Sequence, residues 1–316
     1  MPSEAAGPVK TIALRACPSC RATGSIGVAL DEHPLRRCTT CDLVYAAEYA
    51  DPDDIYKDGY LMGGGTFGPP NVLDPVFHRF LLDAGRQRMA VIEKAIGGPG
   101  AMLDVGCGAG EVLLAAKERG WRTAGADPVE DSVTLARSRG LDVHAALLQD
   151  TGLPERSFDL VSAFHVVEHL TDSTAFLELI ARWARPGGHV LVELPNWASV
   201  HRRRTGAQWP SLRPLEHLGH YSPDTLDATL RRAGLEPVLL RTMGFLWEGQ
   251  TLDQALADLA RQGWAPWFRR SRLLVHERDD HRLEPSAAGW RVLRAVQAAY
   301  DRRRAGQVVF AIARVP

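Results

Sequence analysis

Long uncharged apolar runs are absent from this sequence of 316 residues, and lysine is scarce. No stretch reaches the roughly 18 apolar residues that a helix needs to cross a bilayer. The amino-terminal residues MPSEAAGPVK also lack the apolar segment of a secretory signal. Because 45% of the residues are hydrophobic, the chain can bury a sizeable core. We expect a globular cytoplasmic protein with no membrane partner.

Positive charge comes mainly from arginine and is unevenly placed along the chain. Residues 197–316 carry 19 arginines against 12 acidic residues, a balance of +7, whereas residues 1–196 have a balance of −8. Six of the eight tryptophans also follow Asn196. Arginine and tryptophan together suit anionic or ring-shaped ligands, although solvated helix faces would give the same composition.

Four of the five cysteines form two C-x-x-C pairs, Cys17 with Cys20 and Cys38 with Cys41, separated by seventeen residues. This spacing predicts a tetrahedral zinc site with four thiolate ligands. Four protein ligands leave no open position, so the zinc would be structural and would fold about 35 residues of low apolar content. Unrelated thiols or a redox-active pair are the alternative.

The pattern of hydrophobic residues changes along the chain. Residues 74–96 carry apolar side chains at helical intervals, so a helix should lead into the main domain. From Ala101 onward, short apolar strands alternate with helices, which predicts a doubly wound α/β sheet. We expect strands at 101–106, 122–126, 142–146, 158–164, 189–194 and 236–242, with helices near 110–119, 130–139, 172–185 and 223–233. A last strand over 307–315 should insert antiparallel to the others.

The first strand leads into a glycine-rich turn with the sequence LDVGCGAG. Such a turn lets the backbone approach a ligand closely, although dinucleotide-binding folds use a similar one. Asp104 lies two residues before the first glycine, where a carboxylate suits an ammonium group better than a pyrophosphate. Asp127 ends the next strand, where it can accept both hydroxyls of a ribose. A ligand with a cationic amino-acid part and a ribose fits both carboxylates.

With the later motifs SFDLVSAFHVVEHL and RPGGHVLVELPN, the chain resembles the class I S-adenosylmethionine-dependent methyltransferases. The cysteine pairs and the segment GAQWPSLRPLEHLGHYSP are more narrowly similar to bacterial small-molecule methyltransferases with a zinc-ribbon leader, which serve natural-product or saccharide pathways. The resemblance extends to about residue 245. It implies a Rossmann-like seven-stranded sheet, S-adenosylmethionine as cofactor and structural zinc.

The same resemblance divides the chain into four parts. We expect a zinc ribbon and connector (1–60), a linker and lead-in helix (61–100), a cofactor-binding domain (101–245 with 307–316) and a helical insertion (246–306). An insertion of this length would act as a lid or as a homodimer contact.

The resemblance also assigns cofactor contacts. The methionine part and the ribose of S-adenosylmethionine would bind residues at the first two strand ends, namely Asp104, Gly106, Gly108, Gly110 and Asp127. In the family, an acid at the end of the third strand often meets the adenine. This chain lacks that acid, so adenine contact should come from the backbone at Leu147 or from Gln149.

Methyl transfer from a sulfonium is an in-line displacement, so the protein must align the acceptor and remove a proton from a neutral one. Candidates for this role follow the fourth strand or lie in a later loop: His165, Glu168, His169 and His217. Glu168 and His169 could instead only orient the following turn, and His217 could be a loop histidine held by backbone carbonyls. The four side chains could also bind a divalent metal, because H-x-x-E-H resembles the E-x-x-E-H metal site of some quinone-pathway and small-RNA methyltransferases.

Residues after the fifth strand and in the insertion are candidates for substrate contact: Trp209, His220, Tyr221, Arg269 and Arg270. The two arginines favour an acceptor with phosphate or carboxylate, such as a sugar nucleotide, a diphosphate or a natural-product intermediate. A ribosomal RNA methyltransferase with a zinc-ribbon reader is the main alternative. The acidic balance of residues 1–196 argues against that nucleic-acid partner. We therefore predict a methyltransferase that acts on a small-molecule substrate.

Overall fold

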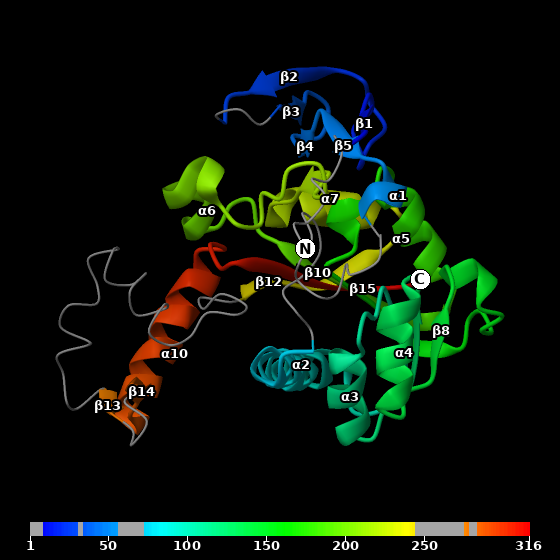
Figure 1. Ribbon diagram of the computed structural model, residues 1–316, viewed down its shortest axis with the longest axis vertical. Coiled ribbons are helices and arrows are strands. Elements are labelled where there is room, and N and C mark those ends of the chain that lie inside the picture. The colour runs from blue at the N-terminus through cyan, green and yellow to red at the C-terminus, as the bar shows by residue number, and fades with distance from the viewer. Residues whose placement is uncertain (1–8, 31–33, 56–72, 244–274, 278–282) are drawn as a thin grey trace, which may run out of the picture.

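The computed structural model describes residues 9–30, 34–55, 73–243, 275–277 and 283–316 (Figure 1). Its centre is a seven-stranded sheet in the order β12-β15-β10-β9-β6-β7-β8. The strands are β6 (Ala101–Val105), β7 (Arg122–Asp127), β8 (Val143–Ala145), β9 (Phe158–Phe164), β10 (Ala184–Pro195), β12 (Glu236–Met243) and β15 (Val308–Arg314). The strands from β10 to β8 pair in parallel, whereas β15 is antiparallel to both β10 and β12. The predicted α/β sheet with an inserted last strand is confirmed.

One predicted boundary is wrong, between the fourth and fifth strands of the sheet. The helix expected over 172–185 is α5 (Ser173–Ala181), and β10 begins at Ala184, five residues before the expected start. Ala184 already pairs with Phe158 of β9, and a register shift separates this pair from the regular ladder that begins at His189. The last residues of the expected helix therefore belong to strand β10 instead.

The other helices that flank the sheet begin within one residue of the starts that we expected. They are α2 (Pro75–Ile96), α3 (Glu111–Glu118), α4 (Glu130–Ser138) and α7 (Pro223–Arg232), with the shorter α1 (Pro52–Ile55) and α6 (Val200–Thr205) outside it. The Ser222 hydroxyl caps α7 by accepting the N–H of Thr225, with Pro223 at the first helical position. Asp172 caps α5 in the same way by accepting the N–H of Ala175.

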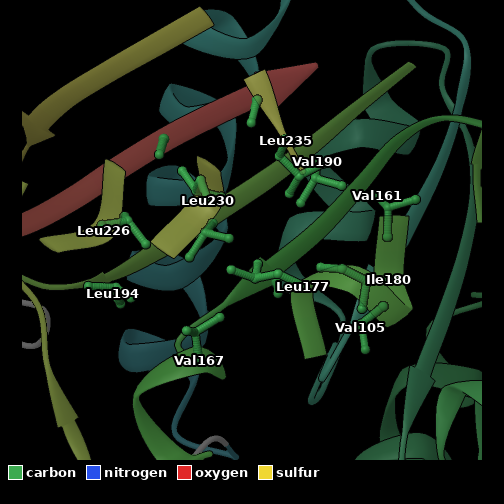
Figure 2. Close-up of a cluster of buried hydrophobic side chains, with 14 of the residues drawn as sticks. Val105, Val161, Val167, Leu177, Ile180, Val190, Leu194, Leu226, Leu230 and Leu235 are labelled. Atoms are coloured by element: carbon green, nitrogen blue, oxygen red, sulfur yellow. The ribbon is translucent and has the colours of Figure 1, made fainter. Parts of the chain in front are cut away.

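Alternate residues of the central strands pack on opposite faces of the sheet. Val161 and Val190 point toward α5 and α7 and join the cluster that Figure 2 shows, with Leu177 among its members. Leu160 and Leu191 belong to a second cluster, which includes residues of α2 and α3. The sheet is thus a buried middle layer with helices on both faces (Figure 1).

The cysteine ribbon, residues 11–50, lies on the α5 and α7 side of the sheet (Figure 1). It contains β1 (Thr11–Ala13) paired with β5 (Glu48–Ala50), and a second sheet of β2 (Ser25–Val28), β3 (Leu35–Cys38) and β4 (Val44–Ala46). That second sheet gains a fourth strand, β11 (Gly219–His220), from the main domain. Ser173 at the start of α5 also donates its N–H to the carbonyl of Pro18 at 2.9 Å. The ribbon and the main domain therefore share a sheet and hydrogen bonds.

The structure describes only part of the expected insertion at 246–306. This part contains helix α10 (Ala287–Arg302), as expected, and a short hairpin of β13 (Val275–Glu277) and β14 (Leu283–Pro285), which we did not predict. Arg241 of β12 forms an ion pair of 3.1 Å with Asp301 at the end of α10. Within the described ranges, no helix combines the length and the apolar character needed to cross a membrane.

Candidate active site

The glycine-rich turn joins β6 to α3 and needs glycine for two reasons. Gly106, Gly108 and Gly110 have positive φ angles of 74°, 52° and 83°, a region that other L residues rarely adopt. A Cβ atom on Gly106 would also lie 2.5 Å from Cγ2 of Val166. The turn therefore closes tightly against the segment that follows β9.

Asp104 lies near the end of β6 with 3% of its surface exposed. The hydroxyl of Ser162 on β9 donates a hydrogen bond of 2.6 Å to Oδ1 of Asp104. Burial raises the pKa of Asp104 to about 7, the hydrogen bond from Ser162 opposes this shift, and the charge of Asp127 adds to it. A cationic ligand group beside Asp104 would offset the cost of the buried charge.

Asp127 ends β7, and both of its carboxylate oxygens accept a main-chain hydrogen bond. Gly108 donates its N–H to Oδ2 at 2.8 Å, and Val129 donates its N–H to Oδ1 at 2.9 Å. Burial raises the pKa of Asp127, and these two hydrogen bonds oppose the shift. Each carboxylate oxygen can accept a further hydrogen bond, so Asp127 is a fixed acceptor beside the turn.

The two residues expected to meet adenine follow β8. Leu147 is 54% exposed and precedes a short 3-10 helix, η2 (Leu148–Asp150), in which Gln149 is also exposed. Leu148 between them is buried and anchors the helix. Leu147 and Gln149 are therefore accessible at the carboxyl end of the strand beside β7.

Glu168, His169 and His217 place one potential ligand atom each within 4.8 Å of one another. Glu168 and His169 lie in the short helix η3 (Val167–His169), and His217 precedes β11. Nδ1 of His169 is 3.0 Å from the carbonyl oxygen of Glu216, and Nδ1 of His217 is 2.8 Å from that of Ser211. Each imidazole can thus donate from Nδ1 and keep the lone pair of Nε2. Burial lowers the pKa of His217 well below its usual value, so this imidazole is neutral.

The carboxylate of Glu168 is almost completely buried, and its two oxygens differ in their hydrogen bonding. Oε1 lies 3.1 Å from Nδ1 of His165, whereas Oε2 has no hydrogen-bond partner among the described residues. The carbonyl of Glu168 accepts the N–H of Leu218 at 2.6 Å, which joins η3 to the segment that carries His217. Buried polar atoms normally have partners, so Oε2 is suited to a proton donor or a cation of a ligand.

The residues expected at the substrate face after the fifth strand are packed into the structure. Tyr221 is fully buried and its hydroxyl is hydrogen-bonded to that of Ser173, so it supports the core beneath the site. Trp209 is buried as well, with its ring centroid 6.1 Å from that of Trp197. His220 packs against Trp197 at 5.2 Å, and burial lowers its pKa to about 3. These positions favour a packing role for Trp209 and Tyr221 over the substrate contact that we expected.

A small pocket opens between the cysteine ribbon and the segment that precedes α7. The ribbon and this segment both line it, with Leu35, Ala46, Glu48, Leu212, His217 and His220 among its walls. His217 therefore belongs both to this pocket and to the cluster with Glu168. Arg269 and Arg270, the other expected substrate contacts, lie outside the described residues.

The sulfur atoms of the four paired cysteines converge within 4.8 Å of one another. Sγ of Cys17 is 3.5 Å from Sγ of Cys41, and Sγ of Cys20 is 3.4 Å from Sγ of Cys38. The main-chain N–H of Thr40 donates to Sγ of Cys38 at 3.4 Å. Four converging sulfur donors fit a zinc ion with tetrahedral coordination.

We did not predict Ser162, whose hydroxyl contacts Asp104. It stands in the fully buried stretch 160–163 of strand β9, and it is the register partner of Asp104 on β6. A polar side chain on a strand that is buried on both faces requires a partner, and that requirement was the available signal.

The comparisons with known proteins agree with this geometry. The family model described as "Methyltransferase domain" matches residues 77–240. A "Ubiquinone biosynthesis O-methyltransferase" of Bradyrhizobium sp. is 28% identical over 155 residues, which are 46% of this chain and 61% of that protein. The chain thus spans less than two thirds of that relative. A "Probable S-adenosylmethionine-dependent methyltransferase" of Mycolicibacterium smegmatis is 31% identical over 202 residues, which are 59% of this chain and 75% of that protein.

A solved structure of a methyltransferase from Thermotoga maritima covers 76% of this chain and 92% of its own, with a TM-score of 0.49 and 16% identity. The domain model spans more than half of the chain and includes the glycine-rich turn, Asp104 and Asp127. The chain therefore belongs to the methyltransferase domain family and is a class I S-adenosylmethionine-dependent methyltransferase.

Proposed function

We propose that the protein transfers a methyl group from S-adenosylmethionine to an oxygen, nitrogen or carbon atom of a small metabolite, with Glu168 as general base. The observation that carries this proposal is the buried Oε2 of Glu168, which lacks a hydrogen-bond partner among the described residues. Strands β6, β7 and β9 are parallel neighbours. Their carboxyl ends, where ligands bind such sheets, carry Asp104, Asp127 and the segment with Glu168.

The cofactor-binding residues would each meet one part of S-adenosylmethionine. Asp104 would bind the ammonium group, Asp127 would accept the ribose hydroxyls, and Leu147 or Gln149 would contact the adenine. When bound, the cofactor supplies a methyl group that is activated by a sulfonium sulfur. Because such a methyl group needs no further activation, the protein contributes mainly by aligning the acceptor.

Glu168 would then handle the proton of a neutral acceptor. An acceptor hydroxyl forms its new bond to the methyl carbon while the electrons of the carbon–sulfur bond return to sulfur, and Glu168 accepts the hydroxyl proton at Oε2. His165 contacts the other oxygen, Oε1, at 3.1 Å and keeps the carboxylate oriented. The imidazoles of His169 and His217 lie beside it, where they can position the acceptor.

We further propose that the acceptor is a small anionic metabolite such as a sugar nucleotide, a diphosphate or a natural-product intermediate. The proposal that the acceptor is anionic rests on Arg269 and Arg270, which lie outside the described residues. The relative from Bradyrhizobium sp. is named an O-methyltransferase, which favours oxygen as the acceptor atom. RNA is the weaker alternative, because the ribbon that would read it uses β4 to pair with β11 and Pro18 to bind the start of α5.

A metal-dependent O-methyltransferase is a second candidate, which the cluster of Glu168, His169 and His217 favours. One carboxylate oxygen and two imidazole nitrogens within 4.8 Å form a plausible ligand set for a divalent cation. A cation at this place would bind the acceptor oxygen and lower the pKa of its hydroxyl. We also propose that Cys17, Cys20, Cys38 and Cys41 bind one zinc ion with a structural role, because four protein ligands fill its coordination sphere.

Transfer of a tritium-labelled methyl group tests the proposed function. S-adenosylmethionine with this label is incubated with the small-molecule fraction and, separately, with the RNA of a bacterial extract. We expect label in small molecules, and a loss of roughly 100-fold or more in the Glu168→Gln variant. The Glu178→Gln variant, which changes an exposed glutamate on α5, is the control and should retain transfer. Label found only in RNA, or full transfer by Glu168→Gln, would contradict the proposal.

Metal analysis separates the two candidates. The metal-dependent candidate predicts a second metal ion per chain that disappears in the His217→Asn variant while the ribbon zinc stays. A single zinc per chain, lost only when the four paired cysteines are replaced, would leave the metal-free base mechanism.

A further inference from the structure

A buried ion pair joins helix α2 to the centre of the sheet. Arg88 of α2 donates from Nε to both carboxylate oxygens of Glu193 on β10, at 3.0 Å and 2.8 Å, and Nη2 of Arg88 also bonds to Oε1. The side chain of Glu193 is fully buried and that of Arg88 is 11% exposed. Burying two charges costs desolvation energy that their attraction often fails to recover. The pair therefore points to a role other than stability.

His165 stands between Glu193 and Glu168. Nε2 of His165 lies 3.5 Å from Oε1 of Glu193, and Nδ1 lies 3.1 Å from Oε1 of Glu168. The main chain adds a third link, because the N–H of His165 donates to the carbonyl of Glu193 at 2.8 Å. Contacts thus run without a break from Arg88 through Glu193 and His165 to Glu168.

The backbone of His165 is strained. Its φ angle is 55°, in the left-handed region that residues with a side chain rarely adopt. Such conformations persist where surrounding contacts hold them, and they cluster at functional sites. At His165, the carbonyl of Glu193 accepts the main-chain N–H, and its carboxylate lies 3.5 Å from Nε2, where it forms an ion pair when the imidazole is protonated but no hydrogen bond.

We infer that Arg88 and Glu193 are positioning residues of the active site: Arg88 fixes the carboxylate of Glu193, and Glu193 holds His165 against Oε1 of Glu168. This inference rests on the proposed role of Glu168 as base, because it explains how Oε1 is occupied while Oε2 stays available. Burial alone would raise the pKa of Glu193, but Arg88 and His165 together lower it to about 2. Glu193 is therefore an ionised and permanent anchor.

The inference gives α2 a specific part in the active site. This helix precedes the sheet in sequence and lies on the face opposite the cysteine ribbon (Figure 1). Arg88 lets it reach β10 in the interior of the sheet, where the carbonyl of Glu193 accepts the N–H of His165. Arg86 is two residues away on α2, but it forms ion pairs on the surface with Asp83 and Glu118, so it provides a matched control.

Side-chain nuclear magnetic resonance of the full chain tests this inference. The protein carries isotope-labelled histidine, is saturated with S-adenosylhomocysteine, and the His165 signals are identified by their loss in His165→Asn. We expect a slowly exchanging Nδ1 proton in the wild type. It should exchange at least about tenfold faster in the double variant Arg88→Met/Glu193→Gln, which removes both charges together and so leaves no lone buried charge. Arg86→Met should leave the signal unchanged.

Calorimetry with S-adenosylhomocysteine on the same samples separates this inference from the proposed function. The double variant should bind it within about threefold of the wild type, because the proposed cofactor contacts Asp104 and Asp127 lie on β6 and β7, whereas Glu193 lies on β10 and Arg88 on α2. Unchanged His165 exchange in the double variant would overturn the inference. If the double variant does not fold, Arg88→Lys replaces it. This variant keeps the positive charge but loses the planar set of donors that binds both carboxylate oxygens. Exchange of the His165 proton must be faster in Arg88→Lys as well, or the inference is wrong. Failure of the wild type to bind would instead refute the proposed function.

Discussion

The Ser162 hydroxyl donates a hydrogen bond of 2.6 Å to Oδ1 of Asp104, and both side chains are buried at the centre of the sheet. This bond connects β9 to β6 at the place where we propose that the cofactor's ammonium group binds. It also opposes the effect of burial on the Asp104 carboxyl, whose pKa is nevertheless raised to about 7. Two predictions depend on this raised pKa.

The affinity for S-adenosylhomocysteine should depend on pH. At a pH below its pKa of about 7, Asp104 is protonated in the free protein and lacks the charge that would hold an ammonium group. We therefore expect the dissociation constant to rise by up to about tenfold for each pH unit below 7 and to level off above pH 7. Calorimetry between pH 5.5 and pH 8.5 measures this dependence. Equal affinities at both ends of the range would contradict it.

The stability of the cofactor-free protein should change with pH in the opposite direction. The pKa of Asp104 is about 7 in the folded chain, above the 3.8 of an unperturbed aspartate, so the folded state binds this proton more tightly. Its contribution to stability is present below about pH 4 and is lost as pH rises to 7, on the order of 4 kcal/mol. Asp104→Asn should thus melt at a higher temperature than the wild type at pH 8, with a smaller gap at pH 5. A difference in melting temperature between the two proteins that does not vary with pH would be evidence against a buried charge on Asp104.

Gly106→Ala should abolish most cofactor binding. The new methyl group would lie 2.5 Å from Cγ2 of Val166, in a backbone conformation with a φ angle of 74°. Gly97→Ala is the matched control, because Gly97 also has a positive φ of 100°, but no atom of the described residues lies within 4 Å of the added Cβ. Calorimetry should find binding weakened at least about thirtyfold in Gly106→Ala and nearly unchanged in Gly97→Ala. Similar losses of binding in the two variants would mean that backbone strain, and not the contact with Val166, weakens binding.

Zinc should be lost when one of the paired cysteines is replaced. Cys38→Ser removes one of four converging sulfur donors, and we expect the zinc content to fall from one per chain to less than roughly a tenth. The melting temperature should fall as well, because the ribbon shares a sheet with β11 of the main domain. Cys107→Ser, which changes the fifth cysteine, inside the glycine-rich turn, should keep its zinc. Elemental analysis of both proteins is the measurement, and equal zinc in the two would refute the site.

Much of the fold was predictable from local patterns. The six strands of the main sheet between Ala101 and Met243 were predictable because short apolar segments alternate there with helical patterns, and one helix start is marked by Ser222. The start of β10 at Ala184 was not predictable, because its pairing with Phe158 depends on a partner far away in the sequence. The addition of β11 to the ribbon sheet was missed for the same reason.

The candidate site divides in a similar way. Asp104 and Asp127 are recognisable because they flank a turn and a strand end in a known order. Tyr221 was expected at the substrate and is packed in the core, since its distance along the chain from Ser173 hid their hydrogen bond. Arg88 and Glu193 were missed, although a glutamate within the apolar run VLVELP of a central strand needs a cationic partner.

Calorimetry of S-adenosylhomocysteine binding to the folded, zinc-containing protein at pH 8 tests the central claim most directly. The claim is that Asp104 and Asp127 hold the amino-acid part and the ribose of one amino-acid nucleoside. We expect one binding site per chain in the wild type and an affinity at least about thirtyfold weaker in Asp104→Asn, because that variant removes the partner of a buried ammonium group. No heat from the wild type, or equal binding by Asp104→Asn, would contradict the claim.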